Sequence, residues 1–138
     1  MNANEISVKD VMLTTENFPV INKNTLFKES LEHMNKTNLG IACVVDERNK
    51  LLGIITDGDV RRNLLKVQKP ISAFFVDDVV SHCVKNPITI LPDDKLNYAV
   101  KIMGEKKVWD LPVVNNDGIL VGLLHLHQAI KKLLEKDI

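Results

Sequence analysis

The segment Thr56-Asp-Gly-Asp59 joins an apolar run to an amphipathic one and carries the side chains best suited to chemistry. Where a strand ends and a helix begins, unpaired backbone N–H groups are exposed, and the helix dipole adds partial positive charge. A threonine hydroxyl can donate to a phosphate oxygen, and a carboxylate can accept from a vicinal diol. The segment therefore predicts a position for a phosphate-bearing ligand.

The same residue types are also typical of helix capping. We expect Asp57 to act as a cap, and Thr56 and Asp59 to contact the ligand. Arg61 and Arg62 fall in the first turn of the predicted helix, where a cation opposes the helix dipole by roughly 0.3–1 kcal/mol. An anionic ligand bound here would offset that cost. Taken singly, each arginine is expected to be a solvated surface residue.

The elements that position this segment occur twice, because the second half of the chain repeats the first at a constant offset. Gly53-Ile-Ile55 recurs as Gly122-Leu-Leu124, with matching internal spacings before it. Each copy is predicted to contain a helix, a two-stranded hairpin and a second helix, after a short extended stretch that carries a proline. The predicted elements are helices at 26–34 and 96–103, strands at 41–45, 51–55, 111–114 and 119–124, and second helices at 60–67 and 128–136.

This order predicts an α+β chain of two pseudo-symmetric repeats, each a small sheet packed against helices. The expected boundaries are 8–67 for the first domain, 68–78 for a linker and 79–136 for the second domain. One copy alone would bury little surface, so we expect the two to pack together. Phe74 and Phe75 in the linker are expected to cover that contact or, alternatively, to meet a partner chain or a further domain.

The order of elements, together with Gly53-Ile-Ile-Thr-Asp-Gly-Asp59 and Leu111-Pro-Val-Val114, resembles a pair of CBS domains. Such pairs sense nucleotides in many enzymes and channels. More narrowly, the segments 38–42, 52–62 and 122–127 resemble the C-terminal CBS pair of arabinose-5-phosphate isomerases, which interconvert ribulose 5-phosphate and arabinose 5-phosphate for lipopolysaccharide synthesis. Because nothing here matches their catalytic domain, the resemblance implies a regulatory fragment or, alternatively, a free-standing relative.

The resemblance also implies a set of ligand contacts. Thr56 would contact phosphate and Asp59 would hold ribose hydroxyls. The residues that would flank a base or sugar ring are Val20, Ile41, Ala42, Leu111 and Pro112, although a core-strand role is the expected alternative for the apolar ones. In the second copy His125 replaces Thr56 and Gln128 replaces Asp59. The second position is therefore expected to be empty or shaped for a different part of the ligand.

Histidines offer one further candidate. His125 and His127 would share one face of a strand, a geometry that metals use. No third ligand lies at usable spacing, so we expect packing or phosphate-facing histidines and no metal site. His82 is expected to be a loop residue.

Composition excludes several classes of function. Basic and acidic residues number 18 each and aromatic content is 4%, which argues against nucleic-acid and anionic-membrane partners. Two cysteines without a pairing pattern, and no signal peptide or apolar run of about 20 residues, predict a cytoplasmic protein. The sequence does not offer a nucleophile with a base beside it, a pair of catalytic carboxylates or a glycine-rich phosphate loop. We therefore expect neither catalysis nor a cofactor.

The sequence thus predicts a regulatory sensor that binds a nucleotide or a sugar nucleotide and shifts the activity of an attached isomerase. A cytidine sugar nucleotide made downstream would be a logical feedback ligand. We expect a homodimer formed through the CBS pairs. The alternative is an oligomerisation module that binds no ligand.

Overall fold

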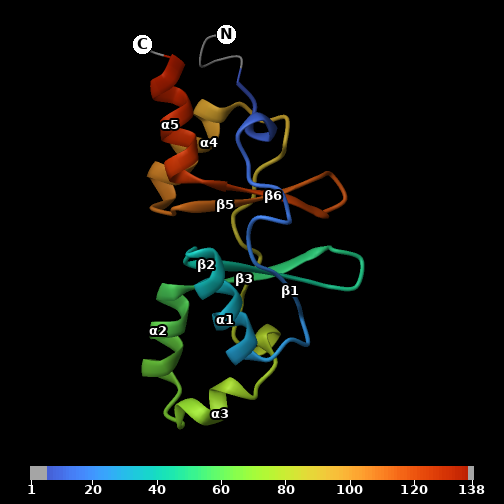
Figure 1. Ribbon diagram of the computed structural model, residues 1–138, viewed down its shortest axis with the longest axis vertical. Coiled ribbons are helices and arrows are strands. Elements are labelled where there is room, and N and C mark those ends of the chain that lie inside the picture. The colour runs from blue at the N-terminus through green and yellow to red at the C-terminus, as the bar shows by residue number, and fades with distance from the viewer. Residues whose placement is uncertain (1–5, 137–138) are drawn as a thin grey trace. The chain divides into compact units, whose positions relative to one another are not determined.

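The computed structural model describes residues 6–136, which divide into two compact units (Figure 1). The 16–87 unit is continuous in sequence. The 88–136 unit also includes the N-terminal segment up to Thr15. The predicted α+β class is confirmed, since helices and small sheets occur in both units. No helix within the described residues is long and apolar enough to cross a membrane.

The 16–87 unit is a four-stranded sheet with its two longer helices on the same side of it (Figure 1). The strand order is β1-β2-β3-β4, with β1 and β2 parallel and the other neighbours antiparallel. The elements are β1 (Val20–Asn22), α1 (Phe27–Thr37), β2 (Ile41–Val45), β3 (Leu51–Thr56), α2 (Asp57–Lys66), α3 (Ile71–Phe75), the 3-10 turn η3 (Val79–Ser81) and β4 (Val84–Lys85).

Apolar side chains of these elements form one core. The buried members are Ile21, Phe27, Met34, Ala42, Val44, Ile55, Phe74 and Val79. The rings of Phe27 and Phe74 meet edge to face, with centroids 6.2 Å apart. Burying side chains of this size stabilises the fold by roughly 1.5–3 kcal/mol each. Phe74 lies in the predicted linker, so part of that segment is helical and belongs to the core of this unit.

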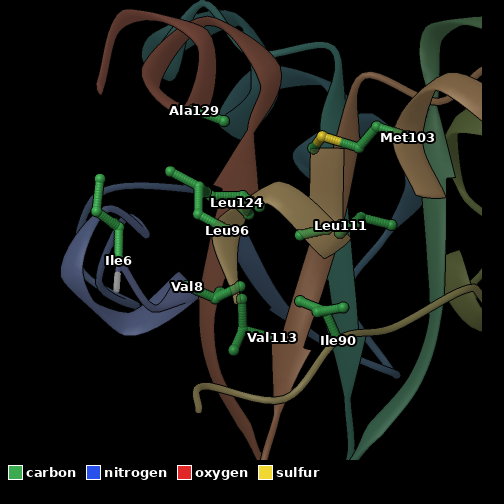
Figure 2. Close-up of a cluster of buried hydrophobic side chains, with 10 residues drawn as sticks. Ile6, Val8, Ile90, Leu96, Met103, Leu111, Val113, Leu124 and Ala129 are labelled. Carbon is green, nitrogen blue, oxygen red and sulfur yellow. The ribbon is translucent and has the colours of Figure 1, made fainter. Parts of the chain in front are cut away.

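The 88–136 unit repeats the arrangement. It contains the 3-10 turn η2 (Val8–Asp10), α4 (Leu96–Lys106), β5 (Asp110–Val114), β6 (Leu120–His125) and α5 (Leu126–Lys136). β5 and β6 are antiparallel, and both helices lie on the same side of them (Figure 1). Figure 2 shows most of its core, which comprises Ile6, Val8, Ile90, Leu96, Ala99, Met103, Leu111, Val113, Leu124 and Ala129.

The edges of the two sheets are built from exchanged segments. In the 16–87 unit the edge strand β4 pairs with β3, although β4 lies at the start of the second copy, ahead of α4. In the 88–136 unit Leu13, which lies at the start of the first copy, ahead of β1, pairs with Leu123 of β6. Its backbone N–H donates to the Leu123 carbonyl over 2.8 Å, and the Leu123 N–H donates back over 3.0 Å. The residues at the edge of each copy's sheet therefore come from the start of the other copy.

Most predicted elements are confirmed, but the starts of the second helices differ. α2 begins at Asp57 and not at Val60, and α5 begins at Leu126 and not at Gln128. Both helices start directly after a strand. At α2 the last strand residue, Thr56, is in extended conformation and serves as the N-cap. The short elements α3, β4 and the two 3-10 turns were not predicted. The sequence boundaries 8–67 and 79–136 describe the duplicated segments and stay a prediction.

Asp77 holds the segment after α3 against the rest of the 16–87 unit. Its Oδ2 lies 2.6 Å from Lys69 Nζ and 2.8 Å from His82 Nε2. The His82 ring also lies 5.1 Å from the centroids of both Phe27 and Phe74. His82, expected as a loop residue, is thus packed beside the core, with 10% of its side chain exposed. Lys69 and, next, His82 keep the pKa of Asp77 below its usual value of 3.8.

The close approach of β4 to β3 requires a residue without a side chain at Gly53. A Cβ atom there would lie 2.6 Å from the Val84 carbonyl oxygen, and one at the equivalent Gly122 would lie 2.9 Å from the Leu13 carbonyl oxygen. We predict that Gly53→Ala lowers the free energy of unfolding by about 1–3 kcal/mol, as overpacking does. Gly104→Ala is the matched control, because it lies inside α4 with open space around it.

Gly104→Ala should raise stability by about 1 kcal/mol through helix propensity. Urea denaturation of the two variants measures both changes. Equal midpoints for Gly53→Ala and the unmodified chain would show that β4 does not depend on this contact.

The interactions of Asp77 predict a dependence of stability on pH. A carboxyl group whose pKa is lowered by folding stabilises the fold fully above its unfolded pKa, and this stabilisation is lost as the pH falls through the folded pKa. Asp77→Asn should therefore lower the melting temperature near neutral pH, and the deficit should shrink as the pH is lowered below 3.8. Asp78→Asn, on the neighbouring exposed carboxyl, is the control. A deficit for Asp77→Asn that stays constant across this range would contradict the assignment.

Candidate functional site

The turn from β3 into α2 is closed by a reciprocal capping box between Thr56 and Asp59. Thr56 is the N-cap in extended conformation, and its Oγ1 accepts from the backbone N–H of Asp59 over 3.2 Å. In return, Asp59 Oδ2 accepts from the backbone N–H of Thr56 over 2.9 Å. Two otherwise unpaired donors at the helix start are therefore satisfied by the protein itself.

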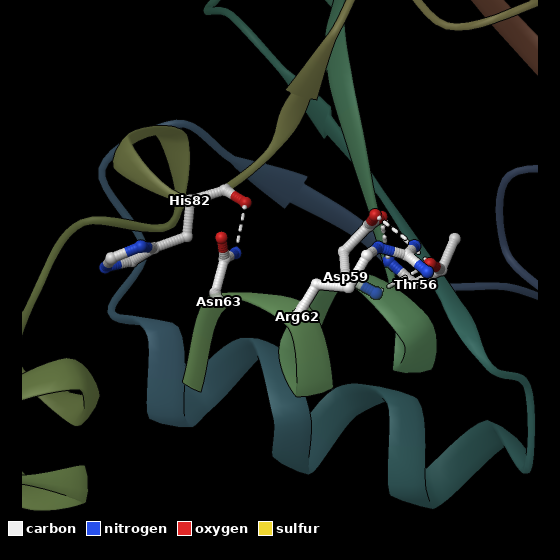
Figure 3. Close-up of polar contacts among 5 residues, drawn as sticks. All are labelled: Thr56, Asp59, Arg62, Asn63 and His82. Carbon is white, nitrogen blue, oxygen red and sulfur yellow. Dashed lines mark hydrogen bonds and ion pairs between the residues drawn. The ribbon is translucent and has the colours of Figure 1, made fainter. Parts of the chain in front are cut away.

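The side chains of Thr56, Asp59 and Arg62 also bond to one another at this turn (Figure 3). The Thr56 hydroxyl donates to Asp59 Oδ2 over 2.8 Å, and Arg62 Nη2 donates to Asp59 Oδ1 over 2.8 Å. Asp59 is 9% exposed, whereas 61% of the Arg62 side chain is exposed. The capping alternative thus describes the geometry of Thr56 and Asp59. Their contact with a ligand stays a prediction.

The structure brings Arg62, but not Arg61 or Asp57, into this cluster. Arg62 folds back along the first turn, and its guanidinium lies against Gly58, where a Cβ atom would come within 3.0 Å of it. The Arg62 cation also neutralises the buried carboxylate that caps the helix. Arg61 and Asp57 are exposed, and the backbone N–H of Asp57 donates to the Gly40 carbonyl over 3.1 Å.

The predicted ring-flanking residues of the first copy lie on strands next to this turn. Ile41 pairs in register with Thr56, and Ala42 pairs with Ile55. Ile41 is 1% and Ala42 0% exposed, so both are core strand residues as the alternative expected. Val20, on β1, is half-buried and pairs with Cys43 of β2.

The equivalent turn of the second copy is built differently. His125 ends β6 and pairs in register with Asp110, the position that Ile41 occupies in the first copy. His125 Nδ1 lies 2.7 Å from Asp110 Oδ1, and the two side chains are 17% and 11% exposed. Burial raises the pKa of Asp110, and the hydrogen bond from His125 opposes that rise. A cross-strand pair of side chains thus stands where the first copy has an apolar residue and a capping threonine.

Gln128 takes the place of Asp59 in the first turn of α5. Its Oε1 is buried and, among the described residues, is the one buried side-chain oxygen or nitrogen without a hydrogen-bond partner. A buried acceptor left in this state costs about 1–3 kcal/mol. Leu111 and Pro112, the other residues predicted for this copy, are buried on β5. The second turn therefore has an unmet capacity to accept a hydrogen bond, which the first turn lacks.

Two aromatic side chains lie beside this second turn. The ring of the exposed His127 lies 4.9 Å from the His125 ring and 6.1 Å from the Trp109 ring. Trp109 is 63% exposed, and its carbonyl accepts from the Leu126 N–H over 2.8 Å. Across residues 6–136 no group of three or more histidine, cysteine or acidic side chains could hold a metal ion.

Sequence reasoning missed Asp110 as a polar partner of His125. The signal was present in the comparison of the two copies, because a carboxylate replaces Ile41 at the same step where histidine replaces Thr56. It also missed Asn63, whose side-chain amide donates to the His82 carbonyl over 3.2 Å and joins α2 to the segment after η3 (Figure 3).

Comparison with solved structures finds the same fold. The chain resembles CBSX2 in complex with AMP, with a TM-score of 0.83 and 26% identity over 96% of this chain and 98% of that one. It also resembles a CBS domain-containing protein of unknown function from Bacillus anthracis, with a TM-score of 0.83 and 22% identity over 99% and 97% of the two chains. The second likeness shows the fold alone.

Curated relatives include longer proteins. The chain is 32% identical over 130 residues to an uncharacterized protein, RP505, of Rickettsia prowazekii, and 33% identical over 126 residues to arabinose 5-phosphate isomerase KdsD of Pseudomonas aeruginosa. These matches cover 94% and 91% of this chain but 39% and 37% of the relatives, so the chain spans less than two fifths of their length.

The family model that matches is that of the CBS domain, over residues 8–66 and 76–135. These two ranges correspond to the two copies found in the sequence and include both strand-to-helix turns. The chain therefore belongs to the CBS domain family and contains a tandem pair of these domains.

Proposed function

We propose that the chain is a regulatory module that binds a nucleotide and has no catalytic role of its own. The observation that carries this proposal is the Thr56-x-x-Asp59 pair at the junction of β3 and α2, in a fold similar to that of a protein solved with AMP. Backbone N–H groups at a helix start suit a phosphate. The hydroxyl and the carboxylate suit phosphate and ribose contacts.

Ligand entry at this turn would require the cluster to exchange partners. Arg62 is the side chain most easily released, because most of it is exposed and its ion pair with Asp59 spans one helical turn. Once it turns away, Asp59 Oδ1 is available to accept from a ribose hydroxyl, and the guanidinium is available to a phosphate. Arg61 would add charge from the neighbouring exposed position.

We also propose that the chain is the regulatory part of an arabinose 5-phosphate isomerase. The support is the match to KdsD, of which this chain spans 37%. In that protein the ligand would bind two conformational states of the module with different affinity. The module would in this way change the activity of an attached catalytic domain. A cytidine sugar nucleotide made downstream would then be the feedback ligand, acting in the cytoplasm.

An assembly module that binds no ligand is the second candidate. One observation favours it: Thr56, Asp59 and Arg62 already satisfy one another, so this turn needs no ligand to be stable. Apolar side chains such as Leu65, Ile71 and Val76 are 74%, 55% and 68% exposed, as surfaces that form contacts between proteins often are. On this proposal the CBS pairs form a homodimer.

We predict that AMP, CMP or a cytidine sugar nucleotide raises the melting temperature of the chain. A ligand at 100 times its dissociation constant adds about 2.7 kcal/mol to the free energy of unfolding. Differential scanning fluorimetry across these compounds, followed by calorimetric titration of any that act, measures the effect. The absence of any shift, together with a dimer in sedimentation experiments, would favour the assembly module.

Asp59→Asn should lower the affinity for that nucleotide at least about tenfold, which corresponds to 1.4 kcal/mol. The amide is a weaker acceptor for ribose hydroxyls and for Arg62. Asp57→Asn is the matched control, since this carboxyl lies two residues away and is exposed. Because Asp59 also caps α2, the stability of each ligand-free variant is measured first. Equal affinity for Asp59→Asn and Asp57→Asn would remove Asp59 from the binding site.

A further inference from the structure

We infer that Asp117, in the turn between β5 and β6, is a site of spontaneous modification at which the aspartate becomes an isoaspartate. The sequence contains two steps at which an aspartate precedes a glycine, Asp57-Gly58 and Asp117-Gly118. A following glycine favours this reaction, because it has no side chain to shield its backbone nitrogen. The structure places the two steps in different surroundings, and the second lets the reacting atoms meet more readily. This inference does not depend on the proposed binding of a nucleotide.

The reaction needs only the chain and water. The backbone nitrogen of Gly118 attacks Cγ of Asp117, an N–Cγ bond forms, and the carboxyl OH leaves as water together with the amide proton. Water then adds to either carbonyl of the resulting cyclic imide. Addition at Cγ restores the aspartate. Addition at the main-chain carbonyl breaks the original peptide bond instead, so that the chain continues through the side chain and its backbone gains one methylene.

The turn that contains Asp117 is exposed and is closed by Asn115. The Asn115 carbonyl accepts from the Gly118 N–H over 3.0 Å. The Asn115 Oδ1 accepts from the N–H groups of Asp117 and Ile119 over 2.9 and 3.0 Å. None of the residues 115–119 belongs to the buried core of the 88–136 unit. Opening this turn therefore breaks a few hydrogen bonds without disturbing the core, and it frees the nitrogen of Gly118.

Asp57 is held more firmly, because the same reaction there requires the start of α2 to unwind. The backbone N–H of Asp57 donates to the Gly40 carbonyl over 3.1 Å. The Asp57 carboxylate also lies against Gly40, since a Cβ atom on that glycine would come within 2.8 Å of Oδ2. The capping box of Thr56 and Asp59 fixes the same turn of the helix. Opening at Asp57 thus costs more free energy than opening at Asp117, and its isomerisation should be slower.

The first copy shows that this turn does not require a glycine after the aspartate. Asp46 takes the place of Asn115, and its carbonyl accepts from the Asn49 N–H over 3.0 Å. Asp46 Oδ1 accepts from two further backbone N–H groups, as Asn115 Oδ1 does. Asn49 has a φ of 64° where Gly118 has a φ of 80°. An asparagine tolerates this left-handed conformation, so Gly118→Asn should keep the turn and shield the nitrogen.

The added methylene would lie beside the cross-strand pair nearest to the turn. Val114 pairs with Leu120, and the two residues are 9% and 4% exposed. The pairing register already shifts between Val113 and Val114. Because register decides which side chains face the core, a longer backbone at the turn would disturb the burial of this pair. The modification would therefore destabilise the 88–136 unit and leave the 16–87 unit intact.

Incubation of the whole chain at neutral pH and physiological temperature, followed by peptide mapping, tests the inference. Isomerisation of Asp117 changes the retention time of its peptide without changing the mass, whereas deamidation of the neighbouring Asn116 raises the mass. Isoaspartate should form at Asp117 at least about tenfold faster than at Asp57, which corresponds to about 1.4 kcal/mol. Equal rates at the two steps would overturn the inference, as would deamidation of Asn116 without isoaspartate at Asp117.

Three variants connect the lesion to the turn. Asn115→Ala should accelerate the reaction, because it removes the side-chain acceptor that closes the turn. Gly118→Asn and Asp117→Glu should suppress it, the second because the longer side chain places the carboxyl group less favourably for ring closure. The melting temperature of the unmodified chain should fall on incubation, while that of Gly118→Asn should not. An equal fall in both, or an unchanged rate in Asn115→Ala, would contradict the inference.

Discussion

The reciprocal bonding of Thr56 and Asp59 stabilises the start of α2 and determines which hydrogen bonds the first copy would have to give up to bind a ligand. A helix that starts directly after a strand leaves several backbone N–H groups without partners. Here a hydroxyl and a carboxylate supply them, and Arg62 compensates the charge of that carboxylate. The same side chains that would meet a nucleotide therefore stabilise α2 in its absence. The affinity of this turn for a ligand would therefore be the difference between two sets of hydrogen bonds, and not the sum of new ones.

The second copy keeps the backbone of the first but changes the chemistry of its turn. The strand pairing is equivalent, since Asp110 opposes His125 as Ile41 opposes Thr56. The hydrogen bond between Asp110 and His125 is held across two strands, whereas Asp59 and Arg62 interact along one helix. Duplication has thus preserved the hydrophobic core and the glycines at the sheet edge, while the polar residues have diverged.

Much of this structure could be predicted from the sequence because its signals are local and occur twice. Short β-branched runs around polar turns indicated the hairpins, helical spacings indicated the longer helices, and the duplication made each assignment support the other. The start of α2 was placed too late because Asp57 and Gly58 lack the apolar spacing on which that prediction relied. The choice between capping and ligand contact at Thr56 and Asp59 could not be made from residue types, since both roles require the same oxygen atoms.

Other features depend on contacts between distant residues. The sequence around Leu13 gives no sign that it pairs with Leu123, and Phe74 could not be assigned to a core from the linker alone. The bond between Asp110 and His125 follows from strand register, which single residues do not reveal.

The exchanged edge segments determine the order in which the two units can fold during synthesis on the ribosome. All strands of the 16–87 unit are available once β4 has emerged, so this unit can fold while synthesis continues. The 88–136 unit differs, because Leu13 at its edge is synthesised well before its partner Leu123. The segment around Leu13 must therefore wait, without its partner strand, until β6 has been synthesised. Closing so long a loop is slow, so the second domain is completed only after β6 has emerged.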